Sequence, residues 1–268
     1  MVNLLSIIAL GFFLGMRHAT DADHVIAVTT IVTRQRSIWK AAAIGGFWGV
    51  GHTLTIFAVG AAIILFDLVI SPRVGLSMEL SVGLMLIILG VMNVFSFRKA
   101  VPEAALEAHA GSASLHTHVH SHGDYVHSHA HSHNPESHSH SVEHTPVAWM
   151  DRLFGKTRLY QPLRPFLIGI VHGLAGSAAV ALLVLTTIRD SRWAVAYLLV
   201  FGIGTIAGMM LITMSIASTF RFVGRSLNFS RRLAIASGLL SLVFGLVVAY
   251  QICFVDGLLT GHPHWTPR

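Results

Sequence analysis

The chain has 268 residues, of which 53% are hydrophobic and only 11% are charged. A soluble globular domain carries about 25% charged residues, so this composition excludes an ordinary soluble enzyme, a disordered protein and a coiled coil. The net charge of +6 comes without a basic helix or an aromatic-rich basic patch, so no nucleic-acid partner is expected. The composition predicts an all-α integral membrane protein in contact with the lipid bilayer.

The first predicted span covers about residues 4–28 and contains a polar motif. Residues 17–24 read Arg-His-Ala-Thr-Asp-Ala-Asp-His, between two apolar stretches. A charge at the centre of a bilayer costs roughly 2.5–3.5 kcal/mol, so the motif indicates functional or tightly paired side chains. The alternative, a loop that ends the first helix, would leave residues 25–32 as an apolar loop.

Helical geometry orders the side chains of this motif. At about 100° per residue, His18, Asp21 and His24 share one face of a continuous helix, whereas Asp23 points away from it. We therefore expect two imidazoles and one carboxylate at a single site. Asp23 and Arg17 could instead hold these ligands in place or open the helix.

Five further stretches without charges are each long enough for one membrane helix. They cover residues 41–66, 80–97, 165–188, 193–220 and 233–255. The sequence thus predicts six transmembrane helices. His52 lies within the second span and His172 within the fourth, each beside a glycine.

Residues 98–164 form a polar insert that contains 12 of the 18 histidines. Such a tract cannot bury a core, so we expect it to be disordered and to bind divalent metal weakly at many positions. A low-complexity linker is the alternative. Most of its histidines alternate with small residues: His116, His118, His120, His122, His127, His129, His131, His133, His138 and His140.

The distribution of Lys and Arg predicts the orientation. The first, third and fifth connections carry 13 of these residues, and the opposite side carries 4. Because cytoplasmic loops are enriched in Lys and Arg, the histidine-rich loop is expected in the cytoplasm. Both termini would then face outward.

The two halves of the chain also resemble each other. Residues 12–18 align with 166–172, residues 49–52 with 202–205, and Gly83 and Gly90 with Gly238 and Gly245, at offsets of 154, 153 and 155. Three helices per copy require an inverted second copy, which is typical of transporters. We expect a 3+3 inverted repeat with residues 1–97 as the first membrane unit, 98–164 as the loop and 165–268 as the second unit.

The candidate metal ligands follow from these observations. Imidazole and carboxylate together suit Ni²⁺, Co²⁺ or Zn²⁺ better than Ca²⁺ or Mg²⁺, which prefer oxygen ligands. The transition-metal ion would be a transported substrate, and no resident cofactor is expected. The candidate residues are His18, Asp21, Asp23, His24, His52 and His172.

The spacing of His18, Asp23 and His24 resembles the signature of the nickel/cobalt transporter superfamily. Gly51-His52 is similar to that family's second motif, and His172–Ser177, read HGLAGS, is similar to its transporter-type urease accessory branch. A comparable histidine-rich loop occurs in the efflux branch. The resemblance implies a multi-pass carrier of Ni²⁺ or Co²⁺ in the inner (cytoplasmic) membrane. The best-known members have eight helices, and the first of these has no counterpart in this chain.

The sequence therefore favours secondary uptake of Ni²⁺ or Co²⁺ and predicts that the chain is not an enzyme. It contains neither the GxxxxGK[ST] motif for ATP nor HExxH. Export in exchange for protons remains an alternative, as do a membrane-embedded metalloenzyme and a membrane-anchored metal sensor or metallochaperone. The loop could also dock a cytoplasmic metallochaperone.

Overall fold

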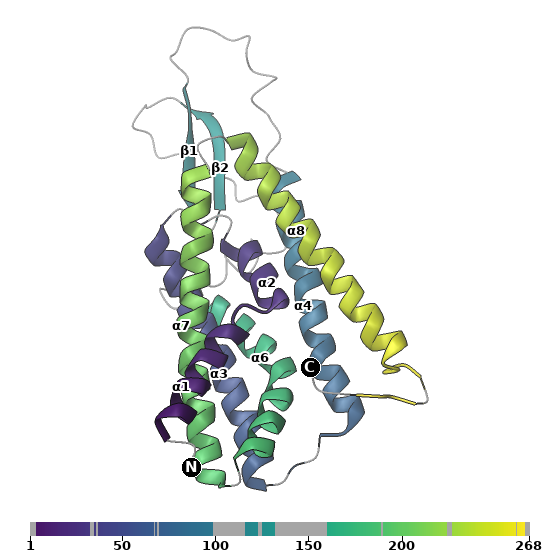
Figure 1. Cartoon of the computed structure of the whole chain (residues 1–268). Coiled ribbons are helices and arrows are strands. Elements are labelled where there is room, and N and C mark those ends of the chain that lie inside the picture. The colour runs from purple at the N-terminus through teal and green to yellow at the C-terminus, as the bar shows by residue number, and fades with distance from the viewer. Residues whose placement is uncertain are drawn as a thin grey trace.

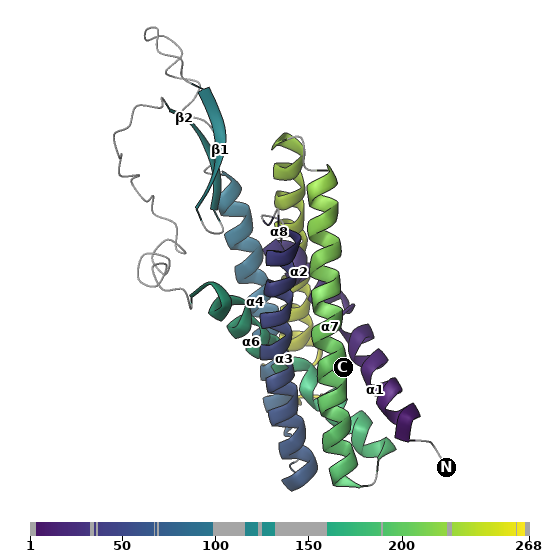
Figure 2. The same cartoon turned by 90° about the vertical axis from the view of Figure 1, so that its left-hand side faces the viewer.

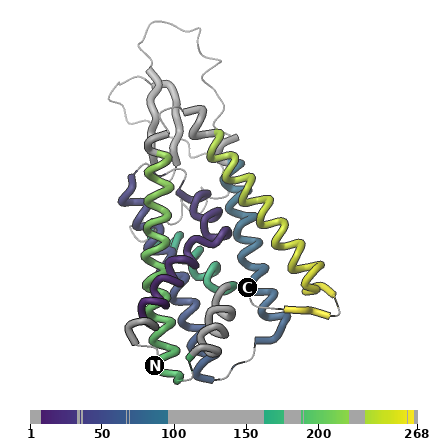
Figure 3. Tube along the Cα trace, in the orientation of Figure 1, coloured from purple at the N-terminus to yellow at the C-terminus, as the bar shows by residue number. Residues whose placement is uncertain are grey.

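The computed structural model describes residues 4–98 apart from 33, 34, 36, 67 and 69, residues 116–122 and 125–131, and residues 160–265 apart from 189, 224–226 and 261. These residues form a helical bundle and one β-hairpin (Figures 1 and 3). The elements are α1 (Leu4–His18), α2 (Ala22–Val32), α3 (Ile38–Phe66), α4 (Pro72–Arg98), β1 (His116–His122), β2 (Tyr125–His131), α6 (Tyr160–Thr187), α7 (Ser191–Val223), α8 (Leu227–Tyr250) and a π-helical turn, η2 (Gln251–Val255).

Four helices of the described chain are long and apolar enough to cross a membrane. They are Ile38–Phe66, Pro72–Phe95, Ser191–Phe220 and Arg232–Val255, in agreement with four of the predicted spans. The fifth charge-free stretch, 165–188, lies within α6 except for its last residue. The fold is therefore helical, with four helices that could span a membrane, while a total of six spans stays a prediction.

The N-terminal segment differs from the prediction of one continuous helix over residues 4–28. The structure divides it into α1 and α2, with Ala19, Thr20 and Asp21 between them (Figure 3). The hydroxyl of Thr20 donates to the carbonyl of Arg17 at 2.6 Å, and the Asp21 amide donates to the carbonyl of His18 at 3.1 Å. Such local bonds compete with helical ones and end α1.

The bundle is assembled through glycines that let backbones approach closely, as is common between membrane helices. A methyl group added at Gly15 of α1 would overlap the carbonyl oxygen of Phe201 in α7. A methyl group at Gly169 of α6 would overlap the carbonyl oxygen of Trp48 in α3 in the same way. Helix α1 therefore lies along α7 and α6 along α3, while α3 and α7 also pack together (Figure 2).

Helices α4 and α8 form the second arm of the bundle (Figure 1). A methyl group at Gly90 would approach the carbonyl oxygen of Gly238 to 2.6 Å, and one at Gly245 would approach that of Gly83 to 2.8 Å. The side chain of Asn93 crosses this interface and donates to the carbonyl of Ala234 at 2.9 Å.

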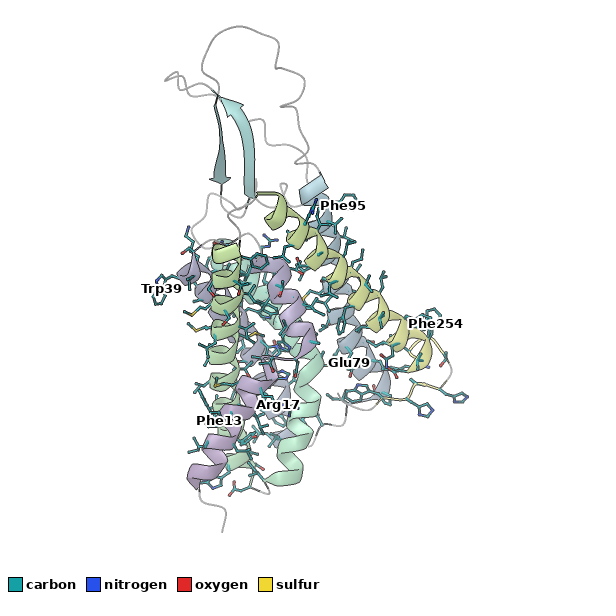
Figure 4. All side chains as sticks on the ribbon, turned by 45° about the horizontal axis from the view of Figure 1, so that its top comes forward. Phe13, Arg17, Trp39, Glu79, Phe95 and Phe254 are labelled. Carbon is teal, nitrogen blue, oxygen red and sulfur yellow. The ribbon has the colours of Figure 1, made fainter. Side chains whose placement is uncertain are left out.

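The outer faces of the bundle are apolar. Phe13, Trp39 and Phe254 are exposed and come from three different helical elements (Figure 4). Exposed apolar side chains distributed around a helical bundle are expected where lipid replaces water. The interior combines large apolar side chains such as Trp48 and Leu86 with polar ones such as Asn93 and Thr205.

Most of the histidine-rich loop, 98–164, lies outside the described residues, so its disorder and the division of the chain into three units stay predictions. The part that the structure describes is an antiparallel pair of strands, β1 and β2, of seven residues each.

Candidate metal site

The break between α1 and α2 brings the motif residues to the centre of the bundle. His18 is the last residue of α1, and Asp23 and His24 lie in the first turn of α2. His52 from α3 and His172 from α6 face them. Five of the six predicted ligands thus meet at one place, although they come from four helices.

Three histidines form a first group, which we call the outer triad: His18, His24 and His52. The Nε2 atoms of His18 and His52 lie 3.1 Å apart. The ring of His24 stands edge-on to both, with centroids 4.7 Å from His18 and 4.9 Å from His52. The outer triad therefore turns three imidazoles toward a common point.

Asp23, His24 and His172 form a second group, the inner triad. One carboxylate oxygen of Asp23 lies 3.0 Å from Nδ1 of His24, and the other lies 3.0 Å from Nε2 of His172. The rings of His24 and His172 are 4.2 Å apart between centroids. His24 belongs to both triads, so the two groups are contiguous.

Burial distinguishes this cluster from ordinary surface histidines. His24, His52 and His172 are 2%, 0% and 1% exposed. Within the described residues, no hydrogen-bond partner is found for Nε2 of His24, Nδ1 of His52 or Nδ1 of His172, while Nε2 of His172 lies 3.0 Å from the Asp23 carboxylate. A buried polar atom without a partner costs about 1–3 kcal/mol, so these nitrogens point to a ligand.

The two aspartates exchange the places that a continuous helix would give them. Asp23, expected to point away, lies between His24 and His172. Asp21 is 51% exposed, belongs to neither triad, and bonds Nδ1 of His18 at 2.8 Å. A carboxylate in this position fixes the orientation and tautomer of a ligating imidazole. Asp21 is therefore placed to orient His18, and its role as a metal ligand stays a prediction.

Two aromatic residues beside the cluster were not singled out from the sequence. Trp48 is fully buried, and its ring centroid lies 5.5 Å from that of His172. Phe201 lies at the same centroid distance, 5.5 Å, from His18. If the alignment of residues 49–52 with 202–205 is continued by one position toward the N-terminus, it pairs Trp48 with Phe201, and this is the sequence signal available for both.

The arrangement can hold a small transition-metal ion. In each triad the candidate ligand atoms lie within 4.8 Å of one another. Bonds of about 2.1 Å place ligand atoms roughly 3–4 Å apart around a metal, so a small contraction would bring the three ligands of either triad to metal-binding distances.

Comparison with known proteins gives the family. No family model and no solved structure matches the chain. The chain is 34% identical over 257 residues, which is 96% of its own length and 96% of the relative's, to the urease accessory protein UreH of Bacillus sp. strain TB-90. That relative is an accessory protein and not itself an enzyme, in agreement with the prediction that this chain is not one. The chain belongs to the family of the urease accessory protein UreH.

Proposed function

We propose that the protein is a secondary transporter that carries Ni²⁺, Co²⁺ or both across the cytoplasmic membrane, with uptake as the favoured direction. One observation carries the proposal: two metal-sized groups of ligands, the outer and inner triads, share His24 in the interior of the bundle. A purely structural metal site needs one closed shell, whereas a carrier needs a site that an ion can both enter and leave.

The donor set supports a borderline transition metal as the substrate. The two triads offer four imidazoles and one carboxylate. Imidazole suits nickel, copper, iron and zinc, whereas Mg²⁺ and Ca²⁺ are bound mainly through oxygen. Neither triad contains a thiolate or thioether, which disfavours Cu⁺ as the preferred ion.

The sharing of His24 supports a path in two steps. The outer triad reaches solvent through His18, which is 16% exposed, and the inner triad through Asp23, which is 31% exposed. The inner triad contains His172, which is buried. An ion could move from one group to the other while keeping its bond to His24, so that it never loses all its protein ligands at once.

The inverted 3+3 repeat is part of the proposal and is supported by matching contacts. Gly15 approaches the carbonyl of Phe201, and its aligned partner Gly169 approaches that of Trp48, which aligns with Phe201. In the same way, Gly90 approaches the carbonyl of Gly238. Its aligned partner Gly245 approaches the carbonyl of Gly83, which aligns with Gly238. A broken helix beside a site between two repeats is a feature of secondary transporters, and it favours six spans, with α1 and α2 together as the first.

The membrane potential supplies a driving force for uptake. Moving one charge across 100 mV is worth about 2.3 kcal/mol, so a divalent cation gains about 4.6 kcal/mol, or more than a thousandfold in concentration. Inward transport thus needs no ATP. Urease is a nickel enzyme, and a carrier that supplies its metal would fit the relative's description as a urease accessory protein. Export coupled to protons is the alternative direction.

Flux measurements in proteoliposomes test the proposal. The protein should carry ⁶³Ni²⁺ or ⁵⁷Co²⁺ into vesicles when the potential is negative inside, and more slowly when it is reversed. His24→Ala should abolish the flux because it removes a member of both triads. His264→Ala, at an exposed position outside the cluster, is the matched control. Binding without flux at either potential would favour a sensor or metallochaperone and contradict transport.

A further inference from the structure

Trp48 carries a buried polar group that belongs to neither triad. Its side chain is fully buried in α3, and no hydrogen-bond acceptor for its Nε1–H group is found within the described residues. A buried indole N–H group usually has an acceptor. A donor of this kind beside a cluster of metal ligands points to an acceptor that arrives together with the ion.

The packing of Trp48 on α6 places this N–H group beside the inner triad. The Cδ1 atom of the indole, which is bonded to Nε1, lies 2.7 Å from the position that a methyl group at Gly169 would take. The side chain of a helical residue leans over the turn that precedes it, so the imidazole of His172 covers this same turn of α6. The ring centroids of Trp48 and His172 are 5.5 Å apart, with their planes at 80°. The N–H edge of the indole and the imidazole of His172 therefore occupy adjoining space.

The aligned position in the second half of the chain has no such group. The continued alignment pairs Trp48 with Phe201, whose ring centroid lies 5.5 Å from that of His18 in the outer triad. The aligned glycines Gly169 and Gly15 approach the carbonyls of Trp48 and Phe201. The two triads thus have an aromatic ring in an equivalent place, but Trp48 can donate a hydrogen bond and Phe201 cannot.

The inner triad leaves part of the coordination shell of a metal open. It supplies three ligand groups, from Asp23, His24 and His172. Zn²⁺ in an open site takes three protein ligands and a water, and a metal in octahedral geometry takes six ligands. An ion in this triad therefore has a place for an oxygen ligand from solvent. Asp23 is 31% exposed, so solvent reaches the triad on its side.

We propose that Trp48 donates a hydrogen bond from Nε1–H to a water or hydroxide that the ion retains in the inner triad. This inference rests on the proposed function, because it requires a metal ion in the cluster. Trp48 is a positioning residue here: it holds an oxygen ligand of the ion and does not bind the ion itself. Partners of this kind orient the ligands of a metal, and their loss typically lowers the metal affinity 10–100-fold.

NMR of the indole groups tests the hydrogen bond. The full-length protein in detergent, labelled with ¹⁵N-tryptophan, contains five indole N–H groups, and Trp48→Phe identifies the signal of Trp48 by its loss. Addition of Zn²⁺, which is diamagnetic, should move the Trp48 indole proton downfield, whereas the exposed Trp193 should not respond. An unchanged Trp48 signal in protein that binds Zn²⁺ by equilibrium dialysis would overturn this inference and leave the transport proposal intact. Protein that binds neither Zn²⁺ nor Ni²⁺ would overturn both.

A second measurement identifies the acceptor. With Co²⁺ in place of Zn²⁺, electron–nuclear double resonance in ¹⁷O-enriched water should detect a solvent oxygen on the ion, and Trp48→Phe should weaken this signal. The affinity for Ni²⁺ should fall about 10–100-fold in Trp48→Phe and stay unchanged in the control, Trp193→Phe. A Co²⁺ ion without solvent oxygen would overturn the proposal even if the indole signal moves, because the acceptor would then be a protein group such as the Asp23 carboxylate. An unchanged ¹⁷O signal and affinity in Trp48→Phe would overturn it as well.

Discussion

The Nε2 atoms of His18 and His52 face each other at 3.1 Å, although the two residues come from different helices and are 34 positions apart in the chain. At this distance one ring nitrogen must donate a hydrogen to the other. In the tautomer of His18 that donates from Nδ1 to the Asp21 carboxylate, Nε2 of His18 accepts, and His52 then donates through Nε2. An ion bound by both Nε2 atoms would displace that hydrogen, which could move to the unpartnered Nδ1 of His52.

Substitution of His52 should weaken metal binding strongly. In His52→Ala the outer triad loses one of its three imidazoles, while the inner triad keeps all its members. We expect the affinity for Ni²⁺ to fall at least about tenfold. Loss of a residue that only orients a metal ligand already costs about 10–100-fold in affinity, and loss of a ligand should cost no less. Isothermal titration calorimetry of the detergent-solubilised protein measures this. An unchanged affinity would remove His52 from the site; His262→Ala, at an exposed position, is the control.

The two aspartates of the motif should respond differently to the same substitution. Asp23→Asn removes the one carboxylate of the inner triad, so we expect transport to be lost. Asp21→Asn keeps an oxygen that can accept from Nδ1 of His18, so its effect should be small. Asp21→Ala should cost about 10–100-fold in metal affinity, as losses of orienting partners do. The measurement is ⁶³Ni²⁺ binding and flux for all three variants.

A common effect of Asp21→Asn and Asp23→Asn would contradict the assignment of different tasks to the two carboxylates. A second informative result would be a large effect of Asp21→Asn together with an inert Asp23→Asn. That result would return Asp21 to the ligand set, as the geometry of a continuous helix suggested.

The helical spans were predictable from the sequence because charge is so costly in lipid. The charge-free stretch 41–66 corresponds to α3, Ile38–Phe66, and 233–255 corresponds to α8 and η2. The equivalence of some glycines was predictable from the alignment of the two halves. Gly15 and Gly169, aligned from the sequence, make equivalent contacts with α7 and α3.

The geometry at the motif was not predictable by the same means. Placing residues around a helix assumes that the helix is continuous, and the local bonds of Thr20 and Asp21 interrupt it. The interruption rotates Asp23 relative to His18. The prediction that Asp23 points away from the face shared by His18 and His24 was therefore wrong. Trp48 was missed because an apolar residue in an apolar span carries no signal of its own; only its contact with His172 shows where it lies.

Close packing at Gly15 should make that position intolerant of a side chain. In Gly15→Ala the new methyl group would meet the backbone of Phe201, which cannot move aside as a flexible side chain can. Overpacking of this kind costs about 1–3 kcal/mol. Gly46→Ala is the matched control, because its methyl group would meet only Met210, with Sδ at 3.6 Å. Thermal unfolding in detergent should show a lower midpoint for Gly15→Ala alone; equal midpoints would contradict close packing of α1 on α7.

Deletion of residues 109–144 should leave transport partly intact. The deletion removes most of the histidine-rich loop, which we expect to gather or buffer metal, but none of the residues of the two triads. Initial rates of ⁶³Ni²⁺ flux at high metal concentration should therefore stay close to those of the full chain, with a larger deficit when metal is scarce. Complete loss of flux with normal expression would show that the loop has more than an accessory role.

Trp48 should report the arrival of the metal by its fluorescence. Its indole ring is buried 5.5 Å from the ring of His172 and 6.4 Å from that of His24, and Ni²⁺ or Co²⁺ bound to these histidines would quench its emission at such short range. Trp48→Phe keeps an aromatic ring at the position and should remove most of the metal-dependent quenching. Trp39→Phe should not, because Trp39 is 80% exposed and belongs to neither the cluster nor its surroundings. Quenching that persists in Trp48→Phe and disappears in Trp39→Phe would place the bound ion elsewhere, since the change in emission follows the tryptophan nearest the metal.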